Sequence, residues 1–163
     1  MLYIQSMARY EDAARQIADE CYARGVAAAA RCLSKLYDGA LSSAGILVSQ
    51  MKLLVAVARF GERGAPMGAI AKILDMDPTT MTRNLQPLEV AGLVRVARSP
   101  GDARVRSVFL TRGGERKIEE MHPLWARAQK TVRQRLGEKR ASELRNLLLM
   151  LVDSLRDLEA LEG

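Results

Sequence analysis

Apolar residues recur every three or four positions along most of the chain, and this is the spacing of amphipathic helices. The helices that this spacing predicts cover residues 12–38, 46–60, 67–74, 77–92, 115–136 and 141–161. Residues 94–98 and 106–110 instead alternate between apolar and polar side chains, which predicts two paired strands. The first helix is rich in alanine and contains Gly25, where we expect it to bend. The predicted fold class is mainly α with a small β-hairpin (α+β).

The helix that begins at Asp77 has one apolar face and one polar face. Asp77 carries a carboxylate suited to capping a helix, and Pro78 fits the first helical position. Met81, Leu85 and Leu88 fall at helical spacing on the face that can pack. The other face carries hydroxyls and a long cation, which suit the phosphates and base edges of DNA. The residues that we expect to contact DNA from this helix are Pro78, Thr79, Thr80, Thr82, Arg83 and Gln86.

The two predicted strands are joined by a basic turn. Pro100-Gly101-Asp102 is typical of a tight turn, and arginines flank it. Two helices followed by such a hairpin favour a winged helix-turn-helix, in which Arg104 enters a minor groove about 6 Å wide and Asp102 orients its guanidinium. The alternative is an exposed loop with incidental charge. The wing residues that we expect to contact DNA are Arg98, Asp102, Arg104 and Arg106.

Positive charge is concentrated in the same part of the chain. The net charge is +6, and residues 78–112 hold six arginines against two acidic residues, so four of the six excess charges lie there. A charge run is often only a solvated face, but its coincidence with the polar helix and the hairpin favours double-stranded DNA as the partner.

Length and composition favour one domain spanning residues 1–163. A chain of 163 residues with 48% hydrophobic content can form one core with a helical extension. No apolar stretch reaches the roughly 20 residues that span a bilayer, and the N-terminus has no signal-peptide pattern. We therefore expect a cytoplasmic protein with no membrane partner.

The last predicted helix carries a wide leucine stripe, formed by Leu144, Leu147, Leu148, Leu151, Leu155 and Leu158. The small winged part offers little surface to cover it, so a second subunit is the expected cover. The alternative is burial within the same chain, against the apolar face of the N-terminal helix. A homodimer also fits DNA recognition, because two half-sites roughly 10 base pairs apart would form a pseudo-palindromic operator.

Short sequences along nearly the whole chain resemble the multiple antibiotic resistance regulator (MarR) family. They are Leu36-Tyr37-Asp38, Gly45-Ile46-Leu47-Val48-Ser49-Gln50, Ile70-Ala71, Thr82-Arg83, Leu88-Glu89-Val90-Ala91-Gly92-Leu93-Val94, Asp102-Ala103-Arg104 and Leu110-Thr111. The resemblance implies an obligate homodimer with interlocking N- and C-terminal helices, usually a repressor released by a small ligand or by cysteine oxidation. It divides the chain into a winged part at about 46–112 and helical dimerisation arms at about 10–40 and 113–163.

Two positions depart from the family pattern. Pro87 stands within the recognition helix, where it cannot donate a hydrogen bond to the carbonyl of Arg83, so we expect the end of that helix to bend or loosen. Leu47 replaces a hydroxyl residue at the start of the second helix, and Ser43 or a backbone group is the expected substitute cap.

The regulatory input has two candidate forms. On one continuous helix Cys21 and Cys32 would share a face but stand about 16 Å apart, so a disulfide would have to join two subunits. Because free thiols in helices are usually inert, redox sensing is the rival hypothesis and a small aromatic or apolar acid in a cleft is the default. Conceivable lining residues, each of which could equally serve ordinary packing or surface, are Arg31, Tyr37, Phe60 and Trp125.

An enzymatic function is not indicated. His122 is the single histidine, and we find neither a metal-binding cluster nor a nucleophile with a base. The Gly113-Gly114 pair lacks the context of a phosphate-binding loop. We therefore expect no cofactor and no metal. A winged-helix module that binds protein instead of DNA remains the alternative of a different class.

Overall fold

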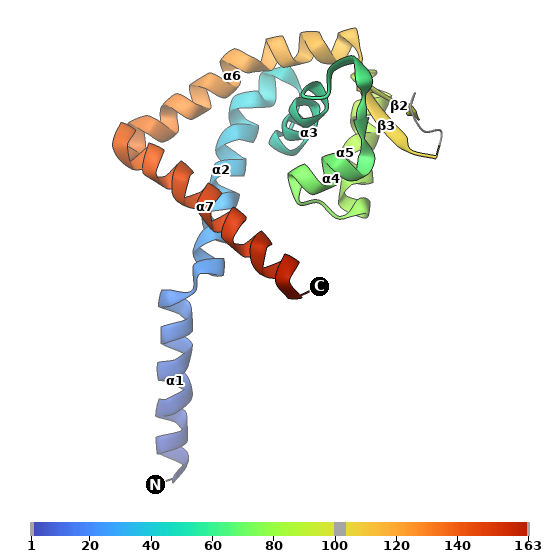
Figure 1. Cartoon of the computed structure of the whole chain (residues 1–163). Coiled ribbons are helices and arrows are strands. Elements are labelled where there is room, and N and C mark those ends of the chain that lie inside the picture. The colour runs from blue at the N-terminus through green and yellow to red at the C-terminus, as the bar shows by residue number, and fades with distance from the viewer. Residues whose placement is uncertain (1, 100–103, 163) are drawn as a thin grey trace.

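The computed structural model describes residues 2–99 and 104–162, and the side chains of residues 9–99 and 104–156. The helices are α1 (Leu2–Glu20), α2 (Tyr22–Leu41), α3 (Val48–Ala58), α4 (Met67–Leu74), α5 (Pro78–Val90), α6 (Arg112–Leu136) and α7 (Glu138–Glu162). The 3-10 turns are η1 (Ser42–Ala44) and η2 (Gly61–Arg63), and the strands are β1 (Ala65–Pro66), β2 (Val94–Arg98) and β3 (Arg106–Leu110). The mainly α fold with a small sheet is confirmed (Figure 1).

The hydrophobic core lies within the winged part and the helices directly above it. Leu53 and Leu54 of α3, Ile70 of α4 and Val108 of β3 are fully buried. Among the described side chains, every buried apolar residue lies between Leu41 and Ala128. The described parts of α1 and α7 therefore contribute none of the core.

The sheet has the order β1-β3-β2, with antiparallel neighbours. The β2–β3 hairpin spans the two strands that the sequence predicted, and it pairs Val94 with Leu110. Strand β1 lies outside the two strands that the alternating pattern predicts. It begins after Gly64, whose φ of 72° and close approach to the Phe109 ring leave no room for a side chain.

The N-terminal helix is interrupted at a different place from the one predicted. Cys21 adopts an extended conformation, with φ −71° and ψ 107°, and it separates α1 from α2. The prediction of one helix bent at Gly25 was therefore wrong, because Gly25 is helical and donates to the carbonyl of Cys21 over 3.2 Å. Arg24 reaches back across the interruption and donates to the carbonyl of Ala18.

The start of α3 is capped from a distance. Leu47 has no side-chain acceptor, and the amide of Val48 instead donates to the Asp38 carboxylate of α2 over 2.7 Å. Gln50 closes the turn by accepting from the amide of Leu47 at 2.9 Å. The expectation that Ser43 would substitute was wrong, since Asp38 satisfies this amide.

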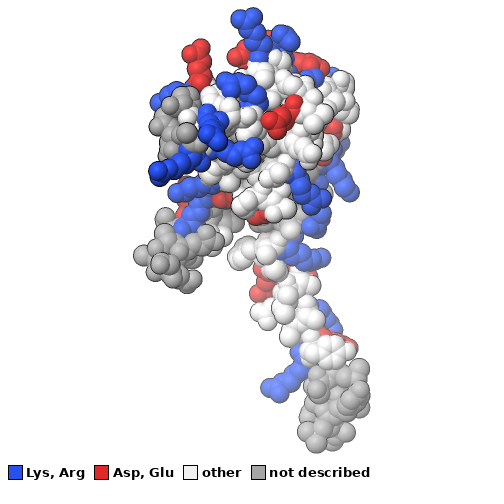
Figure 2. Space-filling model, turned by 90° about the vertical axis from the view of Figure 1, so that its right-hand side faces the viewer, with Lys and Arg blue, Asp and Glu red and all other residues white. Residues whose placement is uncertain are grey.

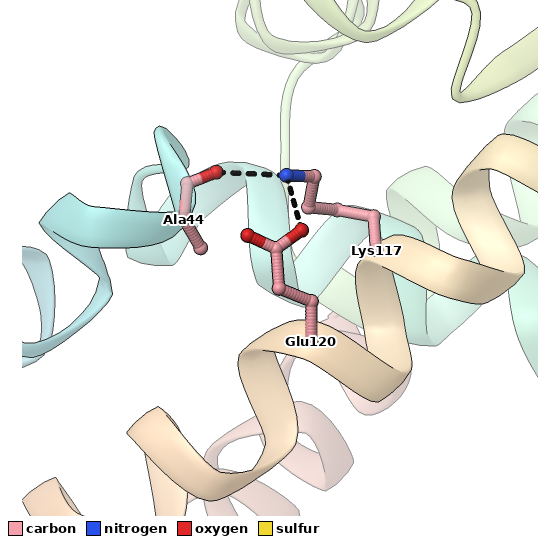
Figure 3. Close-up of polar contacts among 3 residues, drawn as sticks. All are labelled: Ala44, Lys117 and Glu120. Atoms are coloured by element: carbon pink, nitrogen blue, oxygen red, sulfur yellow. Dashed lines mark hydrogen bonds and ion pairs between the residues drawn. The ribbon is translucent and has the colours of Figure 1, made fainter.

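Helix α6 joins the arms to the winged part. Thr111 caps its first turn by accepting from the amide of Gly114 at 3.1 Å. One turn further, Lys117 donates to the carbonyl of Ala44 over 2.9 Å and pairs with Glu120 at 2.7 Å (Figure 3). Lys117 thus holds α6 against the turn between α2 and α3.

No single helix within the described residues is long and apolar enough to cross a bilayer. One pair, Tyr22–Ala44 with Val48–Ala58, passes the length and composition criteria jointly, and it is bent by 76°.

Candidate nucleic-acid interface

The second helix of the helix-turn-helix begins as the sequence predicted. Helix α4 ends at Asp75, which has a left-handed backbone with φ 47°. The Asp77 carboxylate then accepts from the amide of Thr80 at 2.9 Å and from its hydroxyl at 2.6 Å. Hydrogen bonds from the Thr80 hydroxyl and amide lower the pKa of Asp77, so the anionic cap is favoured.

Helix α5 has the two faces that its sequence predicted. Met81, Leu85 and Leu88 are buried against α3 and the sheet. All six residues expected to meet DNA are exposed on α5: Pro78, Thr79, Thr80, Thr82, Arg83 and Gln86. The apolar face therefore fixes the helix, and the polar face stays open to a ligand.

The hydroxyls on this open face are not equivalent. Thr80 donates its hydroxyl hydrogen to Asp77, and Thr82 donates its own to the carbonyl of Pro78 over 2.9 Å. A hydroxyl has one hydrogen, so in this conformation both can only accept further bonds. Thr79, in contrast, makes no side-chain hydrogen bond within the described part of the chain. Donors for phosphates and base acceptors thus come from Thr79, Arg83 and Gln86.

Helix α5 continues through Pro87 to Val90. Pro87 accepts from the amide of Ala91 at 3.0 Å, and Leu88 accepts from the amide of Leu93 at 2.9 Å. The end of α5 is held by these bonds and by the burial of Leu88. Pro87 therefore does not shorten α5, although we expected it to bend or loosen the end of this helix.

The base of the wing brings two arginines together. Arg98 and Arg106 are direct partners in the β2–β3 register, and both are exposed. Like charges opposite each other on antiparallel strands destabilise the pair, and a phosphate between them would remove that cost. Arg104, two residues before β3, is exposed, whereas Asp102 lies outside the described residues.

Arg95 is a further exposed cation that we had not assigned to the interface. Its guanidinium lies 4.0 Å from the centre of the Phe109 ring, and the two residues are register partners. The ring both fills the space beside Gly64 and supports the arginine. Only the strand register could have revealed this pairing.

The arginines of the candidate interface have few acidic neighbours. The ion pairs within the described residues join Lys117 to Glu120, Arg133 to Glu138 and Arg156 to Asp75. Arg83, Arg98 and Arg106 take part in none of them. Figure 2 views the molecule from the side that carries the wing, and basic side chains gather over the upper part of that face.

The last of these ion pairs joins the C-terminal arm to the helix-turn-helix. Arg156 of α7 donates to the Asp75 carboxylate at 2.6 Å, directly at the turn between α4 and α5. Both side chains are about half exposed, at 45% and 64%. A displacement of α7 would therefore act on the turn that precedes α5.

A hollow of about 410 Å³ lies between α3, α4 and α6. Its wall is mostly apolar, and its polar groups come from Lys52, Arg59 and His122. Trp125, one of the proposed lining residues, contributes to it and stacks on His122 with ring centres 5.7 Å apart.

The other proposed effector residues are dispersed. Tyr37 faces separate hollows near Trp125, and burial raises the pKa of its hydroxyl although Arg133 acts in the opposite direction. Phe60 packs against the core, and Arg31 is exposed on α2 away from the described hollows.

The two cysteines occupy different environments. Cys21 is partly buried at the interruption between α1 and α2, and Cys32 is exposed within α2. Both thiols are free. Because the interruption separates them, the prediction that they share one helix was wrong.

Comparison with known proteins identifies the class to which this fold and interface belong. Residues 44–105 match the model of the MarR family. Similar solved structures include the transcriptional regulator MosR of M. tuberculosis, with 27% identity, a TM-score of 0.74 and coverage of 85% of this chain and 98% of MosR. MosR in complex with DNA gives 29% identity, a TM-score of 0.68 and coverage of 82% and 98%. No curated protein matches significantly.

A third similar structure is a mutant MarR from E. coli complexed with operator DNA. It gives 25% identity, a TM-score of 0.71 and coverage of 79% of this chain and 91% of that one. The match of residues 44–105 to the MarR family model and the similar regulator structures confirm the resemblance to this family seen in the sequence.

Proposed function

We propose that the protein is a homodimeric repressor that binds a pseudo-palindromic operator through α5 and the wing. The observation that carries this proposal is the set of exposed arginines on a rigid, capped frame, with Arg83 on α5 and Arg98 beside Arg106 at the wing. None of these three has an acidic partner among the described residues. Support also comes from two similar structures, MosR and a mutant MarR, that were solved in complex with DNA. A regulator of operator DNA would act in the cytoplasm.

The proposed dimer is supported by apolar surface on the arms. In one subunit Leu147, Leu151 and Leu155 of α7 are 57%, 39% and 52% exposed. Tyr22 and Val26 of α2 are also open, at 88% and 43%. A helical stripe of this size would be costly in water, and a second copy is the cover that gives two half-site readers.

The proposed signal is a small aromatic or apolar acid. The hollow between α3, α4 and α6 has an apolar wall for such a body, and Lys52 or Arg59 could hold its carboxylate. Its wall includes Ile73 and Leu74 of α4, next to the turn that begins α5. Binding there could alter the spacing of the two recognition helices and release the operator.

Operator selection separates the roles of Arg83 and Arg104. Arg83 lies in the early turns of α5, so Arg83→Ala should cost about 1–3 kcal/mol per half-site and relax base preference at one symmetric position. Arg104→Ala should weaken binding to every sequence and reduce its salt dependence. Affinity for a randomised operator pool at two salt concentrations measures both. Unchanged preference in the first variant, or unchanged affinity in the second, removes that residue from the interface.

Two rival functions give different results in the same assay. If Cys21 or Cys32 senses oxidants, peroxide should release the operator from the native protein and not from the double Cys→Ser variant. Our proposal expects the double variant to bind the operator and to respond normally to the natural inducer. A winged module that binds only protein would give no salt-dependent DNA shift at all.

A further inference from the structure

Three hollows follow one another along one face of α6. The first, between α3, α4 and α6, is lined from α6 by residues that include Ile118, His122 and Trp125. The second, of about 330 Å³, lies between α2, α3 and α6, and Trp125 is its wall on α6. The third, of about 560 Å³, lies between α2, α6 and α7, and Trp125, Gln129 and Arg133 line it. These five residues recur every three or four positions, so they share one face of the helix.

Neighbouring hollows have wall residues in common. Met51 and Lys52 of α3 line both the first and the second hollow. Leu33 and Tyr37 of α2 line both the second and the third. Trp125 lines all three. The hollows are therefore adjacent, and Trp125 stands in the middle of the row that they form.

The row is long for a ligand site in one chain. Its wall on α6 runs over fifteen positions, from Ile118 to Arg133, which corresponds to about 22 Å along the helix axis. Figure 1 shows α6 extending over α3 and α2 as far as its junction with α7. A single ligand that fills the row must therefore be an extended chain.

The two ends of the row differ in polarity. At the α4 end the wall is mostly apolar and includes Val55, Ile73 and Leu74. At the α7 end the wall is more polar and contains two arginines, Arg133 and Arg145. A carboxylic acid with a long alkyl tail has the same asymmetry, because its charge is confined to one end.

The α7 end has donors for a carboxylate. Arg145 takes part in none of the ion pairs among the described residues, whereas Arg133 shares its charge with Glu138 at 3.5 Å. Burial raises the pKa of Tyr37, although Arg133 acts in the opposite direction, so the hydroxyl keeps its proton and can donate it in a hydrogen bond. An arginine can hold a carboxylate through two parallel hydrogen bonds.

We propose that the row binds one long-chain carboxylic acid, with its carboxylate at Arg145 and its alkyl tail passing Trp125 to reach α4. This inference rests on the proposed regulation by an apolar acid, and it specifies the length and the orientation of that acid. The tail would end beside Ile73 and Leu74, next to the turn that begins α5. One ligand would then contact both the C-terminal arm and the helix-turn-helix.

The single tryptophan of the chain provides the first test, because the emission of Trp125 reports on the middle of the row. Octanoic, dodecanoic and hexadecanoic acid, each kept below its micelle concentration, are titrated into the native protein without DNA. Each buried CH₂ should tighten binding by up to about fourfold, so the dissociation constant should fall steadily with chain length. Equal affinity for the three acids, or emission that none of them changes, would overturn the proposal.

A cationic amphiphile controls for unspecific uptake of alkyl chains. Dodecyltrimethylammonium has the same tail as a long acid but the opposite charge, so a site with Arg145 should bind it much more weakly than dodecanoic acid. Equal binding of the two would contradict a site for carboxylates.

Two arginine variants of α7 test the orientation. Arg145→Gln removes the charge that receives the carboxylate, so the dissociation constant of hexadecanoic acid should rise about tenfold. Arg140→Gln is the matched control and should leave it unchanged, because Arg140 is exposed on the same helix and does not line the third hollow. Loss of binding in Arg59→Gln but not in Arg145→Gln would show that the carboxylate lies at the α4 end, and the proposed orientation would be wrong.

A variant of the α4 end tests how far the tail reaches. Val55 is 43% exposed and lines the first hollow, so Val55→Phe should fold and should narrow this hollow. Binding of hexadecanoic acid should weaken, whereas octanoic acid, held at Arg145, should bind as before. Circular dichroism establishes folding of each variant. Unchanged affinity for hexadecanoic acid would mean that the tail does not reach α3 and α4.

Operator release is measured separately, by adding hexadecanoic acid to the complex of protein and operator. A native protein that binds no operator contradicts the repressor proposal, while the emission of Trp125 still tests the row. A native protein that releases its operator with small aromatic acids, and whose Trp125 does not respond to long acids, keeps the proposed function and overturns this inference alone.

Discussion

The winged part and the helical arms of this molecule differ in how much of their apolar surface a single chain buries. The winged part encloses Leu53, Ile70 and Val108 without any exposed surface, and it caps α5 with its own Asp77 and α6 with its own Thr111. The arms show the reverse: α7 leaves Leu147 57% exposed, and α1 leaves Ile17 68% exposed. One sequence thus specifies a winged part whose core is closed in a single chain and arms whose apolar faces stay open in a single chain.

The largest expected effect would come from a charge on the α7 stripe. Leu151 is 39% exposed in one subunit, so a monomer should tolerate Leu151→Asp. In the proposed dimer the same carboxylate would be buried without a partner, and the dimer should dissociate or unfold. Sedimentation velocity measures the change. Val90→Asp is the control, because Val90 is 83% exposed on the winged part. Equal sedimentation of the two variants would contradict the proposed difference between the winged part and the arms.

Two glycines test packing in the two regions. A Cβ at Gly114 would meet the carbonyl of Leu93 and the side chain of Leu110, so Gly114→Ala should destabilise the winged part by about 1–3 kcal/mol. A Cβ at Gly25 of α2 would meet nothing within 4 Å, so Gly25→Ala should cause no loss and up to about 1 kcal/mol of gain. Urea unfolding measures both. A large loss at Gly25 would show that the partner covers this position.

A smaller effect is expected where the regions meet. Asp75→Arg or Arg156→Asp breaks the 2.6 Å pair between α7 and the helix-turn-helix, and each change should reduce operator affinity by about 0.2–1 kcal/mol. The doubly exchanged chain should recover much of the loss. Operator titrations at low salt test this cycle. Strict additivity of the two single effects would mean that the arm does not position the reader through this pair.

The smallest expected effect is a pH dependence at the start of α5. Hydrogen bonds from Thr80 lower the pKa of Asp77 from its ordinary value of 3.8 in the folded state. The cap therefore contributes stability above that value, and the contribution is lost as the pH falls through the folded pKa. Thermal unfolding of the native chain and of Asp77→Ser should differ least at the lowest pH. A difference that grows on acidification would contradict the charged cap.

The periodic parts of the fold could be predicted from the sequence, and the non-periodic parts could not. Helix α4 and both hairpin strands have the predicted bounds, because their apolar faces repeat over several residues. Strand β1 has two residues and contains a proline, so it has no period to detect. The interruption at Cys21 stands among good helix formers, and Asp38 caps a helix ten residues away.

The sequence predicted which residues are exposed at the candidate interface, but not which of their atoms are free to donate hydrogen bonds. Exposure of Thr79, Arg83 and Gln86 follows from the face that Met81 and Leu85 bury. The loss of the Thr80 and Thr82 donors depends on side-chain rotamers, which no spacing reveals. The hollow between α3, α4 and α6 likewise depends on packing between distant segments.

The narrow sheet also affects whether molecules of this protein aggregate through their sheet edges. Its order leaves β1 and β2 as edges, and an open edge can recruit a strand from another copy and start aggregation. The β1 edge is only two residues long and ends in Pro66, which has no amide hydrogen to donate. The β2 edge carries Arg95 and Arg98, whose charges repel an identical strand. The same arginines that suit a phosphate backbone therefore also keep the sheet from growing.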